Sequence, residues 1–141
     1  MAVSNDSASS IRTQLGTYLS AVTQLQDVAN GRGIEFSGFP GCRYFLSAVE
    51  QVFLDNKPSD QRTFKFDIEI WQEITNKSKP NAESDFEDAV EAVLDTLHTN
   101  WHLGGHCDSM TVDAGPVSQR ESLQGPCVVQ TITVSVMTLI S

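Results

Sequence analysis

The sequence Arg62-Thr-Phe-Lys-Phe-Asp-Ile-Glu-Ile-Trp71 decides the fold of this chain. Aromatic and aliphatic residues occupy every second position from Phe64 to Ile70, and charged residues stand between them. This period of two is typical of a β-strand with one buried face and one wet face. We therefore expect a central strand here, with its apolar face turned toward a hydrophobic core.

The pattern changes to a helical period immediately downstream. After a polar break at residues 76–80, apolar residues recur every three or four positions from Phe86 to Leu97, with acidic residues on the opposite face. Asn81 or Ser84 can cap the first turn, and the glycine pair at residues 104–105 ends the helix. A strand leading into an amphipathic helix can lay that helix over its own apolar face, so this pair is the expected centre of the core.

The N-terminal part predicts a second amphipathic helix. Residues 1–10 are polar and rich in serine, so we expect a flexible lead-in in which Ser9 or Ser10 caps this helix. Apolar residues at helical spacing run from Ile11 to Leu25, and the helix is predicted to end near Asn30. The glycine-rich segment 31–41 lacks the Gly-Lys-Ser/Thr ending of a phosphate-binding loop, which favours turns and close packing.

Three further strands complete the predicted fold. Residues 42–54, whose spacing also suits a helix, are interpreted as a strand because the polar turn after them would form a hairpin with the central strand. A short strand is expected at residues 110–114, then a polar loop at residues 115–126 and a closing strand at residues 128–140. The predicted class is α+β, with a four-stranded, mainly antiparallel sheet and two amphipathic helices in the order α-β-β-α-β-β. We expect one domain over residues 11–141.

Composition excludes several classes of function. The formal charge is −9, with 9 Lys and Arg against 18 Asp and Glu, which disfavours any role that depends on gripping phosphates. Three widely spaced cysteines, an odd number, predict reduced thiols in a core. No apolar run has membrane-spanning length, and residues 1–10 do not resemble a signal peptide, so we expect a protein made and kept in the cytosol.

No constellation of residues predicts catalysis. The carboxylates between residues 83 and 95 spread over the wet face of a helix, and no nucleophile elbow is present. His98, His102, His106 and Cys107 form the one group that resembles a metal-ligand set, but the expected helix break near residues 100–104 separates its members. We predict no catalytic, cofactor-binding or metal-binding residue.

Trp71 is out of phase with the apolar residues that precede it. This phase predicts that its side chain lies on the sheet face opposite the core helix. A buried-type aromatic residue there suggests that the second face is also covered, by another subunit or by the N-terminal helix.

The order of these segments resembles the tail terminator (tail completion) proteins of long-tailed bacteriophages. The resemblance lies in residues 62–74, preceded by Phe39-Pro40 and by residues 53–56. It continues in Ala82-Glu83, in the helix at residues 90–97, in Leu103-Gly104-Gly105 and in the closing strand at residues 132–136. It covers roughly residues 34–141 and rests on pattern and order; the histidine–cysteine group and the serine-rich N-terminus depart from it.

The resemblance implies a structural virion protein. Such subunits close into a ring, a hexamer, on the last turn of the tail tube, where they stop its polymerisation and offer a surface to the head connector. The implied partners are further copies of the chain, the tail tube protein and the head–tail connector protein, while double-stranded DNA passes through without specific binding. No catalytic residue, cofactor or membrane is implied, and the location is the tail–neck region of the virion after assembly in the host cytoplasm.

Two other classes of function stay open. One is a different neck component, such as a head-closure or connector protein, and the other is a small cytosolic metal- or ligand-binding domain. Binding to tail tubes or to filled heads would separate the first of these from a tail terminator, and a metal assay would test the second.

The ring hypothesis predicts where partners bind. Polar loops concentrate partner contacts, so we expect residues 55–62 and 115–124 to reach a neighbouring subunit, the tube or the connector. The predicted interface residues are Asp55, Lys57, Asp60, Arg62, Trp71 and Arg120. The lumen is expected to be net acidic, and charge reversal at Arg62 or Arg120 is expected to impair assembly on tails without unfolding the monomer.

Overall fold

A computed structural model describes residues 7–53, 60–74, 81–105 and 107–140 of the chain. The elements run in the order α1 (Ala8–Ser20), β1 (Asp27–Asn30), β2 (Gly41–Phe53), β3 (Asp60–Glu73), α2 (Ala82–Thr99), the 3-10 helix η1 (Leu103–Gly105), β4 (Ser109–Ser122) and β5 (Gly125–Ile140). The predicted α+β class is confirmed. None of these helices is long and apolar enough to cross a membrane.

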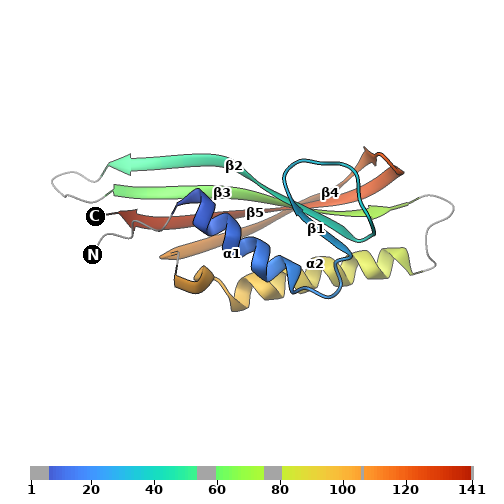
Figure 1. Cartoon of the computed structure of the whole chain (residues 1–141), viewed down its shortest axis with the longest axis horizontal. Coiled ribbons are helices and arrows are strands. Elements are labelled where there is room, and N and C mark those ends of the chain that lie inside the picture. The colour runs from blue at the N-terminus through green and yellow to red at the C-terminus, as the bar shows by residue number, and fades with distance from the viewer. Residues whose placement is uncertain (1–6, 54–59, 75–80, 106, 141) are drawn as a thin grey trace.

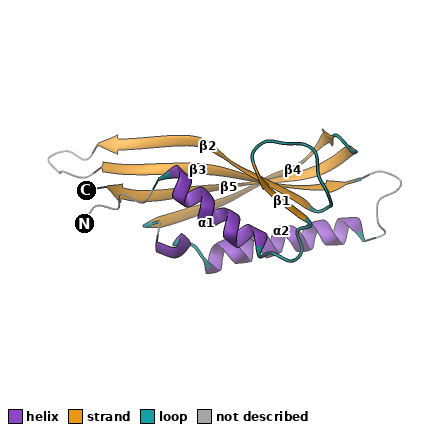
Figure 2. Cartoon of the chain, in the orientation of Figure 1, coloured by secondary structure: helices purple, strands orange, loops and turns teal. Residues whose placement is uncertain are grey.

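The strands form one five-stranded sheet in the order β1-β2-β3-β5-β4. β1 runs parallel to β2, and the other neighbours are antiparallel. Both α-helices lie on the same side of the sheet, and α1 lies beside α2 (Figures 1 and 2). The prediction of four strands was wrong by one, because β1 was not foreseen.

The core lies between the helices and one face of the sheet, as the alternation in β3 predicted. Four apolar residues of β3, every second one along the strand, are at most 4% exposed. They pack in one cluster with side chains from both helices and from β5; the β3 members are Phe64, Phe66, Ile68 and Ile70, and the others include Ile11, Leu15, Leu19, Phe86, Val93, Leu97, Ile132, Val134 and Val136. Because β3 pairs with β2 on one side and β5 on the other, it occupies the middle of this core.

The N-terminal helix is shorter than its apolar pattern predicted, and it begins earlier. Ser7 is the N-cap, and its hydroxyl accepts a hydrogen bond from the backbone N–H of Ser10 at 3.2 Å. The helix ends at Ser20, yet Val22 and Leu25 are still buried in the turns after it, which explains why the apolar spacing continued. Residues 27–30, predicted as the end of the helix, are β1.

The predicted loop at residues 115–126 is wrong. Strand β4 continues to Ser122, turns at residues 123–124 and returns as β5. Gly115 and Pro116 form an irregularity in the pairing between Ala114 and Val117 instead of ending the strand. An edge strand tolerates such residues because only one of its sides carries ladder hydrogen bonds.

The end of α2 lies where the sequence indicated. The helix stops at Thr99, and Gly104 and Gly105 take positive φ values of 65° and 94°, which glycine adopts without strain. Leu103 folds back into the core and is fully buried. At the other end, Asn81 occupies the N-cap position, but its side chain makes no capping hydrogen bond.

Replacing Phe66 by Ala is expected to lower the free energy of unfolding by about 3–5 kcal/mol, because the side chain is fully buried and the surrounding core cannot collapse into the cavity. Urea denaturation followed by circular dichroism measures the change. Val49→Ala on β2, where the valine is 51% exposed, is the control and should cost less than about 1 kcal/mol. Equal losses in the two variants would contradict the assignment of the faces of β3.

Candidate functional site

A second, smaller core lies on the sheet face opposite the helices, which we call the far face. Trp71 is 1% exposed there and packs with Phe36, Cys127 and Val129. The rings of Trp71 and Phe36 have centroids 5.2 Å apart, and Phe39 lies 5.3 Å from Phe36. The prediction that Trp71 lies opposite the core helix is confirmed.

The segment of residues 31–40, which we call the strap, supplies the cover over Trp71. It leaves β1 and reaches the turn between β4 and β5, where the Leu123 N–H donates to the carbonyl of Ile34 at 3.0 Å. The side chain of Gln124 accepts from the N–H of Phe36 at 3.3 Å and donates to its carbonyl. The strap therefore connects β1, at one edge of the sheet, with the turn between β4 and β5 at the other edge. The N-terminal helix α1 does not cover Trp71, because it lies with α2 on the opposite face of the sheet.

Two ion pairs hold the polar groups of the far face. Arg43, 5% exposed, donates to Asp27 at 3.0 Å and to the carbonyls of Cys42 and Glu35, and its guanidinium lies 4.2 Å from the centroid of the Phe36 ring. Across the strands, Glu69 accepts from Arg120 at 2.9 Å and from the indole N–H of Trp71 at 3.3 Å. Because each buried charge has a partner within the chain, these groups support the fold of the strap and sheet.

The environment of Asp27 favours its ionised form. Burial alone would raise the pKa of this carboxyl, but the hydrogen bonds from Arg43 and from the backbone of Ser37 outweigh burial and hold the pKa below its ordinary value of 3.8. The folded state therefore stabilises the ionised carboxylate relative to the unfolded chain. Asp27 ties β1 to β2 and to the strap through these contacts.

The interface residues predicted from sequence fall into three groups. Asp55 and Lys57 lie outside the described residues, and Asp60 and Arg62 belong to β3, not to a loop. Arg62 donates twice to Gln51 on β2, at 3.0 and 3.1 Å. Trp71 and Arg120 lie together on the far face, with the Arg120 guanidinium 5.6 Å from the indole centroid. The structure thus brings only the last two together.

The cysteines are buried. Burial raises the pKa of Cys42 to about 12, and burial is also the largest cause that raises the pKa of Cys127. Cys107 is buried and donates to the carbonyl of Ser109 at 2.8 Å. The Cys42 and Cys127 thiols therefore have little thiolate character at neutral pH.

The histidines near the end of α2 do not converge on a common point within the described part of the chain. His98 lies on the last turn of α2, and His102 comes after the helix end, where its ring lies 5.1 Å from that of Trp101. His106 is outside the described residues. Over residues 7–53, 60–74, 81–105 and 107–140, no group of three or more His, Cys, Asp or Glu side chains is placed to hold a metal ion.

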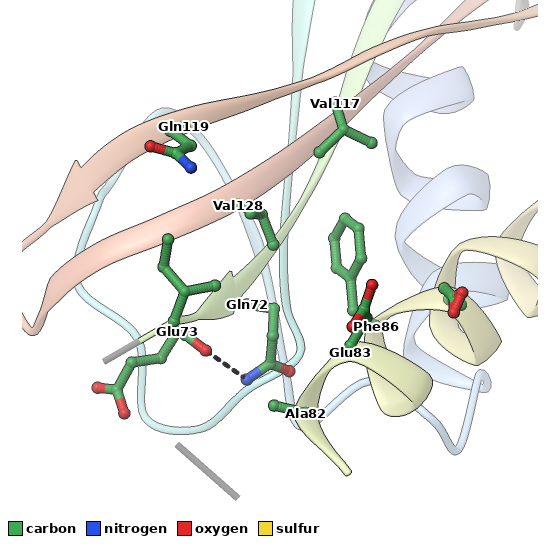
Figure 3. Close-up of a pocket in the computed structure, with 10 residues that line it drawn as sticks. Gln72, Glu73, Ala82, Glu83, Phe86, Val117, Gln119 and Val128 are labelled. Carbon is green, nitrogen blue, oxygen red and sulfur yellow. Dashed lines mark hydrogen bonds between the residues drawn. The ribbon is translucent and has the colours of Figure 1, made fainter. Parts of the chain in front are cut away.

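A hollow of about 530 Å³ opens between the start of α2 and the ends of β3 and β4 (Figure 3). Phe86, Val117 and Val128 line its apolar side, and Glu73, Glu83 and Glu87 are among its polar residues. The Gln72 amide donates to the backbone carbonyl of Glu73 at 3.3 Å. The lining contains carboxylates, amides and apolar groups, and it offers neither a nucleophile nor a cation among the described residues.

Strands β4 and β2 carry edges without a neighbouring strand in the described part of the chain. β4, 14 residues long, is exposed over most of its length and pairs only with β5 among the described strands. β1 pairs with β2 only over residues 41–44, so the remainder of β2 has no strand on its outer side in the described part of the chain. Sequence reasoning missed both edges, because the loop predicted at residues 115–126 concealed the length of β4 and no local pattern reports which strand is outermost.

Comparison of the chain with protein families and with curated proteins found no match. No protein-family model matches the chain, and neither does a curated protein. Its function therefore has to be inferred from the surfaces of the chain and from the resemblance in the order of the sequence segments.

Replacing Arg120 by Ala is expected to lower the free energy of unfolding by about 1–2 kcal/mol, because Glu69, 8% exposed, keeps only the indole hydrogen bond. The solvent exposure of Arg120 keeps the loss below that of a fully buried pair. Glu121→Ala, on the same exposed strand, is the control and should change stability by less than about 0.5 kcal/mol. Equal effects in urea denaturation would contradict a supporting role for the Arg120–Glu69 pair.

Replacing Asp27 by Asn is expected to lower the free energy of unfolding at pH 7 by about 1–2 kcal/mol, because the charge-assisted bond to Arg43 is lost. A carboxyl with a lowered folded-state pKa contributes its full stabilisation above its unfolded pKa and loses it as pH falls through the folded pKa. The difference in the free energy of unfolding between the variant and the natural protein should therefore disappear below about pH 3.8. Urea denaturation from pH 7 to pH 2.5 measures this difference. A difference that stays constant over the range would show that the Asp27 carboxyl does not contribute to stability through its ionised form.

Proposed function

We propose that this chain is a structural subunit that closes into a ring at the end of a phage tail tube, where it ends tail polymerisation and joins the tail to the head connector. The observation that carries the proposal is the pair of unpaired sheet edges, on β2 and on β4, within one subunit. Two different exposed edges suit head-to-tail contacts, and such contacts generate rings when the rotation between subunits closes. The resemblance in segment order supports the tail as the place of assembly.

The distribution of charged groups supports a structural role over a catalytic one. On the far face, Arg43 is bound to Asp27 and Arg120 to Glu69. Burial raises the pKa values of the Cys42 thiol in the main core and of the Cys127 thiol on the far face, which disfavours reactive thiolates. Polar side chains arranged this way stabilise a scaffold. A subunit of this kind acts through its surfaces.

The acidic balance of the chain suits a passage for DNA. Helix α2 carries Glu83, Asp85, Glu87, Asp88, Glu91 and Asp95, and no Lys or Arg. A lumen rich in Lys and Arg would hold phosphates at many points, whereas carboxylates leave DNA free to move. We propose that the lumen of the ring is net acidic.

The test is assembly in solution and on tails. Light scattering and negative-stain electron microscopy of the purified chain should show a closed ring of several copies, and the protein should bind the ends of tail tubes in preference to filled heads. A chain that is monomeric at all concentrations and does not bind tubes would contradict the proposal. Preferential binding to filled heads would favour a head-closure or connector protein instead.

Arg62→Glu is expected to reduce binding to tube ends at least about tenfold while the circular dichroism spectrum stays unchanged, because the side chain is only half-buried and its side-chain hydrogen bonds in the described structure go to Gln51. Raising the salt concentration should weaken binding of the natural protein for the same reason. Arg12→Glu, on α1, is the matched charge reversal. Normal binding by Arg62→Glu, or an equal loss in both variants, would remove Arg62 from the proposed interface.

A further inference from the structure

The two unpaired edges are open at the same end of the sheet. β1 covers the outer side of β2 as far as Tyr44, and from residue 45 to residue 53 no described strand lies beside it. Arg32 binds the carbonyl of Leu46, and the pairing of β2 with β3 shifts register between Leu46 and Ala48, so the regular open segment of β2 begins at Ala48. On the other side of the sheet, β4 pairs regularly with β5 from Ser109 to Ala114, and the irregularity at residues 115–116 comes next. Pro116 has no N–H, so it cannot donate to a further strand on the outer side.

The register of the sheet places these two open segments level with each other. Tyr44 is opposite Ile68, which is opposite Ile132, which is opposite Ala114. The last residue of β2 that β1 covers is therefore level with the last residue of β4 before the irregularity. Three successive antiparallel pairings separate β2 from β4, so the two strands run in opposite directions. An outer β2 and an outer β4 from two copies can therefore meet as an antiparallel pair.

We infer that the edge of β2 in one copy, residues 48–50, pairs with the edge of β4 in the next copy, residues 109–111, so that the sheet continues from subunit to subunit. This inference rests on the proposed ring and names the surface that closes it. Repetition of one such contact is head-to-tail and uses both open edges of every copy.

Charge complementarity on the far face supports a second copy of the chain as the partner of the β2 edge. Arg32 lies at the outer edge of β2, where it donates to the carbonyl of Leu46 at 3.3 Å and its guanidinium is 3.9 Å from the centroid of the Phe45 ring. Asp113 of β4 is level with Phe45 through Asp67 and Thr133, and it is exposed on the same face. In the described structure neither Arg32 nor Asp113 has an ion-pair partner. The inferred pairing sets them side by side across the junction.

Apolar side chains match on the helix-covered face. Val49, opposite the core residue Phe64, is 51% exposed on β2. At the same level beside β4, a groove between α2 and the strand is lined by Leu94, Leu97, His98, Trp101, Met110 and Val112. Trp101 and Val112 are 46% and 36% exposed. The inferred junction covers Val49 of one copy with this groove of the next.

Pairing of two β4 edges around a two-fold axis fits these observations less well. Such pairing would bring no opposite charge to Arg32 or Asp113, whereas the β2–β4 pairing sets the two side by side. It would also leave the edge of β2 and its exposed Val49 unused. The β2–β4 pairing uses both edges and joins opposite charges.

Engineered cysteines test the junction in the full chain. Ala48 is level with Thr111, and Glu50 is level with Ser109. Within one copy each pair is separated by three strand spacings, about 14 Å, which is too far for a disulfide. Mild oxidation of Ala48→Cys/Thr111→Cys, or of Glu50→Cys/Ser109→Cys, should therefore give a ladder of covalent oligomers on a denaturing gel. The single variants and the natural protein should give none.

The cross-linking results distinguish β2–β4 pairing from pairing between two identical strands. A covalent dimer from Thr111→Cys alone would show β4–β4 pairing, and one from Ala48→Cys alone would show β2–β2 pairing; either overturns the inference. A ring seen by light scattering with no cross-link in either double variant overturns the junction and leaves the proposed ring standing. A monomer by light scattering, with no cross-link, contradicts both.

A charge exchange provides a second test that does not require a disulfide. Arg32→Asp and Asp113→Arg should each raise the dissociation constant for self-association at least about tenfold, and the double variant should recover most of the loss. Analytical ultracentrifugation measures the constants, and circular dichroism checks the fold. Losses that simply add in the double variant would show that the two residues do not meet.

Discussion

The structure depends on the backbone pairing of β3 along both of its sides. β2 covers one side from Gly41 to Phe53, and β5 covers the other from Cys127 to Ile140. With both sides occupied, the alternation of its side chains fixes two faces. Phe66 and its neighbours at even positions enter the core beneath the helices, while Glu69 and Trp71 are directed to the far face. A shift of one residue in either pairing would exchange these two sets.

The parts of the fold that sequence reasoning recovered are those in which one face meets the core. β3, α2 and β5 show clean periods because burial demands apolar residues at fixed spacing. The second half of β4 shows none, since its exposed side chains leave the strand held by backbone bonds to β5, and Gly115-Pro116 resembles a loop. β1 is four residues long and comes after an apolar spacing that is typical of a longer helix. Its position depends on Arg43, which is distant in sequence.

The candidate site was less predictable than the fold, for the same physical reason. The phase of Trp71 located it on the far face, but its partners come from the strap and from β4, and only the three-dimensional register joins them. Arg120 was expected at a partner interface as a loop cation. Its ion pair with Glu69 instead means that a charge reversal there disturbs the fold as well as any partner contact, because it would place two carboxylates together beside an indole.

Unpaired sheet edges invite uncontrolled association, and the arrangement of this sheet limits it. On β2 the regular open segment begins after the register shift between Leu46 and Ala48, and on β4 it stops at an irregularity containing a proline. A second copy can therefore form only a short ladder, and a strand that slides along either edge loses backbone partners. In the inferred junction Arg32 and Asp113 act in the same direction, because they would oppose each other at one register only. The excess negative charge of the chain repels copies in every orientation, so an orientation that joins opposite charges is favoured over the others. Short open segments and one matched charge pair together favour one register of the proposed head-to-tail contact over the others.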